Sequence, residues 1–228
     1  MNARLPALAT AISTVSPSPV VFLHVAVFMA GNNTISDETF RLVRFQGQES
    51  ISDHFEYELE LHANTSPEHG TPIAFADLVG RPVTAGIHYP AQGDNGESPT
   101  REDANQWFQD ALNGRDESRR LALFNGIVAS CAMEQPGVYR ITMRPALWKL
   151  TLTNAYRVHA QRNVRDAIED LLKLHRVDYS VDALMGSDNL AYTRVQDWLQ
   201  AGESDYDFLQ RLMSKAHIYY FVTAGARS

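Results

Sequence analysis

Alternating hydrophobic and polar residues predict that the chain is rich in β-strands from Phe40 onward. The segment FRLVRFQGQ, residues 40–48, alternates around Leu42 and contains Gly47, a residue type that often marks a bulge or turn within a strand. The next segment, FEYELEL, alternates strictly, as a half-buried strand does. One set of its side chains is expected to face a core and the other to face away: Phe55, Tyr57, Leu59 and Leu61 inward, and Glu56, Glu58 and Glu60 outward.

One more strand is predicted over residues 81–89, and two or three others between residues 121 and 160. A short helical turn closed by Gly80 precedes the first of these strands. Pro136 and Gly137 are expected to make the turn between the next pair. Pro145 has no N–H to donate to a sheet, so we expect it at a strand end or edge.

Residues 90–120 interrupt the strands with a polar stretch rich in Gly, Pro, Asn and Asp, which predicts a long surface insertion. Helical spacing inside the stretch predicts a small amphipathic helix, carried by Trp107, Phe108, Ala111 and Leu112. Two interpretations remain open for this insertion. It is either a loop that packs on its own protein or a knob that binds a partner, and in the second case the β-rich domain and its insertion would form an autonomous binding module.

Two helices are predicted in the last third of the chain. Asn163 is the expected N-cap of the first, and Ser204, with Asp207 three residues later, resembles a capping box at the start of the second. Each helix carries one apolar stripe: Val164, Ala167, Ile168, Leu171 and Leu172 in the first, and Phe208, Leu209, Leu212, Met213 and Ala216 in the second. Residues 218–222 then predict a strand whose partner comes from earlier in the chain or from another polypeptide.

The N-terminal region, residues 1–39, is interpreted as an extension. Its nine-residue apolar run contains a histidine and is too short for a membrane span, which needs about 20 apolar residues. The cationic start and longer apolar run of a signal peptide are missing. The remaining interpretations are a disordered extension, an extra edge strand, or an upstream segment that is not translated because synthesis starts at Met29.

Composition narrows the classes of partner. The chain has 228 residues with 20 basic and 27 acidic side chains, a net charge of −7, so the clustered cations that bind nucleic acid are missing. Cys131 is the only cysteine, which excludes a disulfide framework and fits folding in a reducing compartment.

The glutamate row is the most tempting candidate for catalysis. Alternate strand residues lie about 6.7 Å apart, close to the roughly 6.5–9.5 Å that separates the two carboxyls of an inverting glycosidase. Glu56, Glu58 and Glu60 would, however, stand on one face, whereas a glycosidase needs carboxyls that flank its substrate. A solvated polar face is the simpler interpretation, with a glycoside hydrolase as the alternative.

Histidines offer weaker candidates for chemistry. His54 or His62 could join the glutamates at a metal, and His62 and His69 lie near Glu68, but no second ligand cluster accompanies either set. Ser52, Asp53 and His54 have the composition of a hydrolase triad, yet neighbouring residues of a strand would point to opposite faces. His217, next to Tyr219 and Tyr220, is expected at a helix end. No catalytic, metal or cofactor site is therefore assigned.

Six segments together resemble one known family. They are FRLVRFQGQESISDHFEYELEL, DLVGRPVT, FNGIVAS, YRITMRPALWKLTL, NVRDAIEDLL and LQAGESDYDFLQRLMSKAHIYYF. Their order and spacing resemble the N-terminal hub region of type VI secretion VgrG spike proteins, which is shared with Rhs-associated Vgr proteins and with tail-hub proteins of contractile phages. The residues that carry the resemblance are Phe45, Gly47, Phe55, Gly80, Gly126, Pro145, Trp148, Glu203, Ser204, Asp205, Phe208, Leu209, Tyr219 and Tyr220.

The resemblance implies a β-rich α+β fold: an antiparallel β-barrel of the phage tail-hub type, helical connector segments, and the start of a second barrel-like unit. It implies a structural protein without enzymatic activity, in which three chains form a ring that joins the tube of secreted hexamers to a puncturing needle. Baseplate components and effectors are further implied partners. Assembly in the bacterial cytoplasm and ejection with the spike are the implied locations.

The resemblance also divides the chain. Residues 40–160 correspond to the hub barrel with its insertion at 90–120, and residues 161–228 to a helix-containing connector that leads to a missing second barrel. The chain is thus expected to be a fragment, a split gene product or a degenerate copy. His217 stands where the family usually has a glycine, so it is expected to adopt a helix-ending conformation that favours glycine, or to use a different cap.

Overall fold

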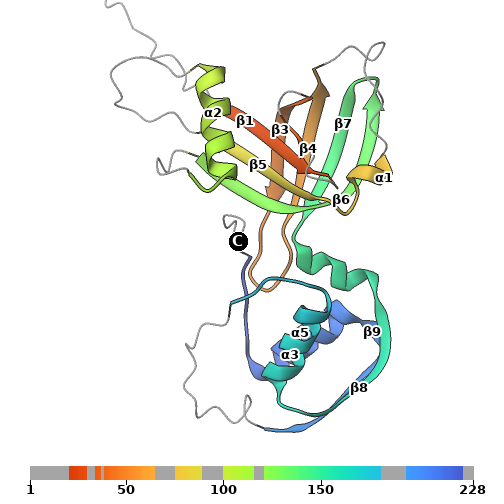
Figure 1. Cartoon of the computed structure of the whole chain (residues 1–228). Helices are drawn as coiled ribbons and strands as arrows, with labels where there is room; N and C mark the ends of the chain where they lie inside the picture. The colour runs from red at the N-terminus through yellow and green to blue at the C-terminus, as the bar shows by residue number, and fades with distance from the viewer. Residues whose placement is uncertain are drawn as a thin grey trace, which may run out of the picture.

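The protein has two parts, which are joined by one short helix (Figure 1). The computed structural model describes residues 21–29, 34–36, 39–64, 75–88, 100–115, 121–180 and 194–222. We call the upper part, with strands β1 to β7, the sheet unit, and the lower part, with β8, β9, α3 and α5, the helical unit. Each has its own hydrophobic core.

The sheet unit is one antiparallel sheet whose strand order is β2-β1-β5-β6-β7-β4-β3. Its strands are β1 (Phe22–Phe28), β2 (Thr34–Ile35), β3 (Phe40–Gln48), β4 (Glu56–Ala63), β5 (Pro82–His88), β6 (Leu121–Gln135) and β7 (Val138–Arg144). The sheet curves so strongly that β1 contacts β3 from the other end of the strand order. The predicted β-rich antiparallel fold is confirmed. Because no ladder joins β1 to β3 within the described residues, the sheet does not close into a barrel there.

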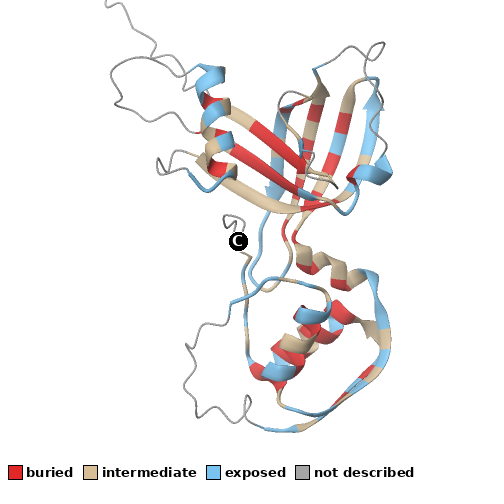
Figure 2. Cartoon of the chain, viewed as in Figure 1, coloured by how far each residue is buried: buried red, intermediate tan, exposed pale blue. Residues whose placement is uncertain are grey.

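The strict alternation of β4 is confirmed. Phe55, Tyr57, Leu59 and Leu61 are buried, while the three glutamates between them are only partly covered (Figure 2). The aromatic side chains here pack closely: the ring of the partly buried Phe45 stacks on that of Tyr57 at 4.8 Å, and the ring of Phe55 is tilted against that of Tyr57 at 4.7 Å. Aromatic pairs at such distances stabilise a core beyond the area that they bury.

The apolar run near the N-terminus forms β1, which lies inside the sheet order between β5 and the two-residue strand β2. Val25, Ala26 and Val27 are fully buried. The run therefore belongs to the folded sheet, close to its edge. Residues 1–20 lie outside the described part of the chain, and whether synthesis starts at Met29 stays untested.

The helix predicted within the insertion is confirmed as α2 (Arg101–Leu112). Thr100 caps it in a complete capping box with Asp103. Phe108 is buried against the sheet, where its ring stacks on the imidazole of His24 at 5.1 Å. This helix thus packs on its own protein; residues 89–99 and 116–120 lie outside the described part.

The turns that the sequence predicts are also present. The short helix α1 (Phe75–Leu78) is followed by Gly80 with φ +80°. Pro136 and Gly137 connect β6 to β7. Pro145 ends β7, and residues 146–152 then form the 3-10 helix η2 (Ala146–Leu152) rather than continuing the strand.

Gly47 has a different role from the predicted bulge. The bulge in β3 lies between Leu42 and Arg44, where the register with β4 shifts. A Cβ on Gly47 would lie 2.3 Å from the carbonyl oxygen of Glu56 and 2.3 Å from Cδ1 of Tyr57. Glycine is needed here because the neighbouring strand approaches too closely for a side chain.

The helical unit is built from β8 (Asn154–Arg162), α3 (Val164–Leu174), β9 (Gln196–Ser204) and α5 (Asp205–Ala216). Strands β8 and β9 form an antiparallel ribbon, and the helices cover one of its faces. Asn163 and Ser204 cap α3 and α5 as predicted, and both predicted apolar stripes are buried. The core of this unit already includes Leu147 and Leu150, so the change of core lies before residue 160; the division into domains stays a prediction.

The end of α5 confirms one expectation and corrects another. His217 adopts the left-handed conformation with φ 55° and ψ 36°, and the next residue, Ile218, donates its N–H to the carbonyl of Met213 at 2.9 Å. The predicted strand over residues 218–222 is wrong: the segment joins no ladder within the described chain. It is held instead by packing and by backbone hydrogen bonds, one from Ile218 to Met213 and one from Ser52 to Tyr220.

Candidate functional site

The candidate site is the junction at which the sheet unit meets the helical unit. The loop that connects β3 to β4 extends down from the sheet to α5 and to residues 218–222 (Figure 1). At its tip, Ser52 has a positive φ of 60° and uses both of its backbone groups. Its N–H donates to the carbonyl of Tyr220 at 2.9 Å, and its carbonyl accepts from Nε2 of Gln210 at 2.8 Å. The two units are thus joined by hydrogen bonds between residues far apart in the chain.

Side chains extend this contact into what we call the junction network: Asp53, Tyr206, Gln210 and Tyr220. The Tyr206 hydroxyl donates to Oδ1 of Asp53 at 3.0 Å and lies 3.0 Å from the Tyr220 hydroxyl. Nε2 of Gln210 lies 2.7 Å from the Tyr206 oxygen and 3.2 Å from the Tyr220 oxygen. The network is part-buried, with Tyr206 buried and Asp53 at its exposed end, and its connected hydrogen bonds favour one arrangement of the two units.

The protonation states suit the junction network at neutral pH. The backbone N–H of His54 lowers the pKa of Asp53, and the Tyr206 hydroxyl adds to the effect against the opposing influence of burial. Burial raises the pKa of both Tyr206 and Tyr220. The carboxylate therefore stays an acceptor and the phenols stay donors.

Ser52, Asp53 and His54 do not form a catalytic triad, although for a different reason than expected. They lie in the loop before β4 rather than in a strand. Asp53 is engaged by Tyr206, and the His54 ring packs edge-on against the same tyrosine at 5.4 Å. Nδ1 of His54 lies 3.3 Å from Oδ1 of Asp53, but no hydrogen bond joins the Ser52 hydroxyl to the His54 ring in the described structure, so the relay from serine to histidine is not formed.

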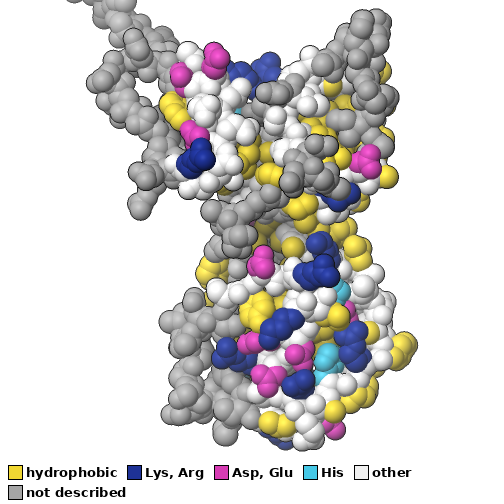
Figure 3. All heavy atoms as spheres, in the orientation of Figure 1, with side chains coloured by type: hydrophobic (Ala, Val, Ile, Leu, Met, Phe, Trp, Pro, Cys, Tyr) yellow, Lys and Arg dark blue, Asp and Glu magenta, His cyan; other side chains and the backbone are white. Residues whose placement is uncertain are grey.

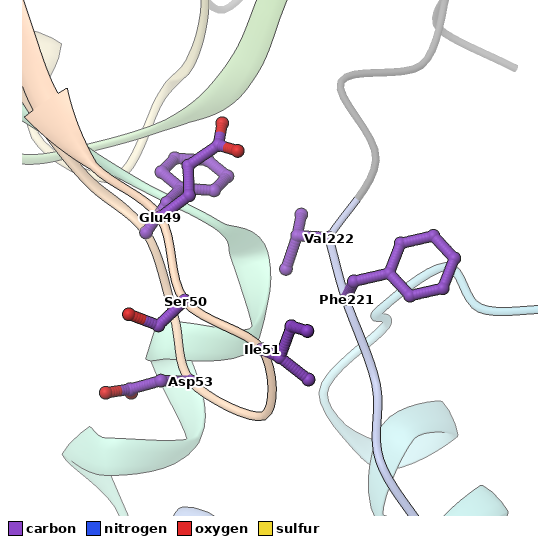
Figure 4. A pocket seen from close by; sticks show the side chains of 7 residues that line it. Glu49, Ser50, Ile51, Asp53, Phe221 and Val222 are labelled. Atoms are coloured by element: carbon purple, nitrogen blue, oxygen red, sulfur yellow. The ribbon is translucent and has the colours of Figure 1, made fainter.

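The extended segment 218–222 contacts both cores. Ile218 and Tyr220 pack against the core of the helical unit, and Val222 packs against that of the sheet unit. Tyr219 and Phe221, in the opposite phase, are exposed. A cavity of about 250 Å³ opens beside the segment (Figure 4), lined by Glu49, Ser50, Ile51, Asp53, Phe55, Phe221 and Val222.

The residues Glu203, Ser204 and Asp205 organise the helical unit from the start of α5. The Ser204 hydroxyl accepts from the N–H of Asp207 at 3.0 Å and donates to its carboxylate at 2.6 Å. Glu203 binds the guanidinium of Arg211 two turns along the helix. The Ser204 cap and the ion pair between Glu203 and Arg211 together fix where α5 begins.

Asp205 is the buried centre of this arrangement, with 2% of its side chain exposed. Oδ1 accepts from Gln200 Nε2 at 2.7 Å, and Oδ2 accepts from Thr153 Oγ1 at 3.0 Å and contacts His175 Nε2 at 2.6 Å. Burial alone would raise the pKa of Asp205, but the hydrogen bonds from Gln200, His175 and Thr153 outweigh it and lower the pKa. The carboxylate thereby holds the end of η2, the end of α3 and β9 to the start of α5.

Other residues that carry the resemblance have clear structural roles. A Cβ on Gly126 would lie 2.7 Å from the carbonyl oxygen of Arg144, so the strands approach too closely for a side chain. The Arg144 guanidinium lies over the Trp148 ring, 5.2 Å from its centre, and joins β7 to η2. Phe208 and Leu209 are fully buried beneath the ribbon. The significance of these residues for the family stays a prediction.

The three glutamates of β4 are bound by residues of their own sheet rather than poised around a substrate. Glu56 forms an ion pair with Arg144, Glu58 accepts from Gln46 at 2.6 Å, and Glu60 contacts His62 at 3.0 Å. The pairs of Glu56 and Glu58 cross to neighbouring strands and so stabilise the sheet, whereas the pair of Glu60 and His62 lies along β4 itself. They support the interpretation of a polar face, and the hydrolase alternative has no observation in its favour.

A search of the described residues for metal-binding groups finds no cluster of three or more His, Cys, Asp or Glu side chains. His69 and Glu68 lie outside the described part. Among the described helices, none is long and apolar enough to cross a membrane. Cys131 is half-buried in β6, and this burial raises the pKa of its thiol to about 11.

Comparison with known proteins gives consistent results. The family model described as phage tail baseplate hub (GPD) matches residues 48–228. The chain is 29% identical over 194 residues to the type VI secretion system spike protein VgrG1b of Pseudomonas aeruginosa PAO1, covering 83% of this chain and 21% of that protein. It is 27% identical over 207 residues to VgrG1c of the same strain, covering 89% of this chain and 24% of that protein.

The chain thus spans about a fifth to a quarter of the length of these relatives. Among solved structures, it is similar to the E. coli c3393 protein, described as a type VI secretion component resembling the T4 tail proteins gp27 and gp5. That match has a TM-score of 0.44 and 14% identity and covers 86% of this chain and 40% of the other. It is also similar to the 43 kDa tail protein of prophage MuSo2 from Shewanella oneidensis, with a TM-score of 0.46 and 12% identity, covering 85% and 50% of the two chains.

Proposed function

Because the chain belongs to the phage tail baseplate hub family, we propose that it forms the hub region of a type VI secretion spike of the VgrG kind. The observation that carries this proposal is the family match over residues 48–228, most of the chain. The likeness to two VgrG spike proteins along more than four-fifths of the chain supports the secretion system as the setting. The role is structural, and no residue is assigned a catalytic task.

The junction suits a part that must hold its shape under load. The loop at Ser52 and the junction network tie the sheet unit to α5, so the two units are expected to move as one. The network around Asp205 does the same within the helical unit. A hub made of such units transmits force to its neighbours with little internal motion.

The proposed assembly has three copies of the hub in a ring, docked on the tube of secreted hexamers and carrying the needle. Residues 40–160 serve as its barrel domain and residues 161–228 as the connector to a second barrel. Baseplate components and effectors are the other proposed partners. The complex is assembled in the bacterial cytoplasm and leaves the cell with the spike.

The test replaces the matched segment of VgrG1b by residues 21–222 of this chain, which include every strand of the sheet unit. The purified chimaera is expected to form a trimer and to bind the hexameric tube protein in a pull-down. A chimaera that folds and trimerises but does not bind the tube protein would count against the hub role. Glu58→Gln in the same chimaera serves as the control, because the structural role predicts unchanged assembly whereas a hydrolase would lose turnover.

A further inference from the structure

His159 lies on β8, where the β8–β9 ribbon meets α5. Its imidazole stacks on the ring of Phe208 at 5.0 Å, with the two planes 22° apart, and Phe208 is fully buried. Across the ribbon, His159 is paired with the uncharged Trp198 of β9, which belongs to the core of the helical unit. We call the stacked pair of His159 and Phe208 the ribbon latch, because it packs β8 against α5.

The surroundings of the imidazole favour its neutral form. Nε2 of His159 is buried and has no hydrogen-bond partner among the described residues. A neutral imidazole can leave one nitrogen without a hydrogen, whereas both nitrogens of an imidazolium are donors. Protonation would therefore place a buried N–H without an acceptor on Nε2, together with a positive charge.

Charged groups from three elements lie around His159. Arg157 and Arg162 come from β8 itself, Asp170 from α3 and Asp205 from α5. Burial is the main cause that lowers the pKa of His159 from its ordinary value of 6.5. The two guanidinium groups lower this pKa further, and the two carboxylates act in the opposite direction.

Both of these carboxylates are engaged by other residues. Asp170 forms an ion pair with Arg162 at 3.2 Å, and Oδ2 of Asp205 contacts Nε2 of His175 at 2.6 Å. In Figure 3, basic, acidic and histidine side chains lie together on the visible face of the helical unit. A new positive charge at the ribbon latch would thus enter a site whose negative charges already have partners.

The Phe208 ring does not offset this cost. A cation above an aromatic face is attracted to it, but the guanidinium of Arg211 already lies 5.0 Å from the centre of the same ring. An imidazolium stacked on Phe208 would share that ring with Arg211 and would repel its like charge. The ribbon latch is therefore expected to be weaker when His159 is protonated.

We propose that His159 makes the helical unit sensitive to mild acid: protonation of its imidazole weakens the ribbon latch and loosens the β8–β9 ribbon from α5. The proposal does not depend on the hub function. Above pH 6.5 the imidazole is neutral in the folded and unfolded chains, and the latch contributes fully to stability. Because the pKa is lower in the folded chain, the unfolded chain takes up the proton first, so stability is lost as the pH falls through the folded pKa.

The first experiment titrates His159 in the full chain by NMR, following its Cε1–H signal from about pH 8 to pH 5, with His159→Phe to identify the signal. The midpoint is expected below 6.5. Arg157→Gln should raise the midpoint, because it removes one of the repelling cations. A midpoint at or above 6.5 in the wild type overturns the proposal, and this holds even if His159→Phe fails to fold, since His159→Gln then identifies the signal.

The second experiment compares urea denaturation at pH 7.5 and pH 5.5, a range in which Asp205 stays ionised. His159→Phe keeps an aromatic ring on Phe208 but cannot take up a proton. The unfolding equilibrium constant of the wild type should rise about three- to tenfold more than that of His159→Phe, tenfold being the limit for one proton over this step. His62→Phe is the matched control: His62 is 45% exposed on β4 of the sheet unit, so this variant should keep the loss of stability in acid.

Amide hydrogen exchange locates the loosening. After correction for the intrinsic effect of pH, the amides of β8 and β9 in the wild type should exchange several-fold faster at pH 5.5 than at pH 7.5. Those of β6 and β7 in the sheet unit should not change, and His159→Phe should not show the acceleration. Equal pH dependence of the wild type and His159→Phe, in denaturation or in the exchange of β8 and β9, overturns the proposal.

Discussion

The buried carboxylate of Asp205 gives the sharpest prediction about stability. In Asp205→Asn, the side chain keeps its volume, but one of the two oxygens that accept from Gln200, Thr153 and His175 becomes an amide that itself donates. At least one donor is then left unpaired in a site where only 2% of the side chain is exposed. Hydrogen bonds to a charged group contribute about 1.5–3 kcal/mol each, and breaking a buried pair costs about 3–5 kcal/mol.

We therefore expect Asp205→Asn to lower the free energy of unfolding by about 3 kcal/mol, equivalent to a fall in Tm of roughly 6–12 °C for a domain of this size. Urea denaturation followed by circular dichroism measures the change. Asp207→Asn is the matched control, because Asp207 lies two residues along the same helix, is exposed, and should cost less than about 1 kcal/mol.

The pH dependence gives an independent reading of the same site. In the folded chain the pKa of Asp205 is lowered from its ordinary value of 3.8. The contribution of its carboxylate to the free energy of unfolding is therefore fully present above pH 3.8 and is lost as the pH falls through the folded pKa. The gap in stability between the wild type and Asp205→Asn should therefore narrow below about pH 4. If Asp205→Asn lowered the free energy of unfolding at pH 7 by less than about 0.5 kcal/mol, no more than Asp207→Asn does, the reasoning from the buried network would be refuted.

Three further predictions follow from the junction and the sheet. Tyr220→Phe removes the hydroxyl that contacts Tyr206 and Gln210, so it should lower the free energy of unfolding by about 1 kcal/mol. Hydrogen exchange followed by mass spectrometry should show faster exchange of the backbone amides of residues 49–54. Unchanged exchange would mean that the junction network does not couple the two units. Gly126→Ala places a Cβ 2.7 Å from the carbonyl oxygen of Arg144 and should lower the free energy of unfolding by about 1–3 kcal/mol. Gly114→Ala, which has open space around it but a positive φ, should lower it by about 1 kcal/mol. Equal losses for the two variants in urea denaturation would contradict the close-approach argument. Because the thiol pKa of Cys131 is about 11, iodoacetamide should alkylate the folded chain far more slowly at pH 8 than the urea-unfolded chain, and equal rates would show an accessible thiolate.

Local signals account for what could be predicted from the sequence. Period-two alternation located β4 and its buried side chains, because a strand places successive residues on opposite faces. Caps and apolar stripes located α3 and α5, since each helix end needs partners for its free backbone groups. The resemblance, which places His217 where the family usually has a glycine, implies either the left-handed conformation or a different cap, and His217 adopts the left-handed conformation.

The junction could not be predicted because its contacts join residues that are remote in sequence. Tyr206 lies 153 positions from Asp53, and Gln210 lies 158 positions from Ser52. No periodicity marks such pairs, and polar residues at the tip of a loop look like any solvated turn. The same limit explains two expectations that the structure corrects. Gly47, expected to mark a bulge or turn, is required by the close approach of Tyr57, and residues 218–222, expected to form a strand, have no ladder partner in the described chain.

Secretion tests the proposed hub function most directly. In a Pseudomonas aeruginosa strain whose native VgrG1b is replaced by the chimaera carrying residues 21–222 of this chain, the amount of chimaera in the culture medium is measured by immunoblot. The hub function predicts that the chimaera appears in the medium and that its release requires a working secretion sheath. A chimaera that is stable and trimeric inside the cell but absent from the medium, while native VgrG1b is released under the same conditions, would contradict it.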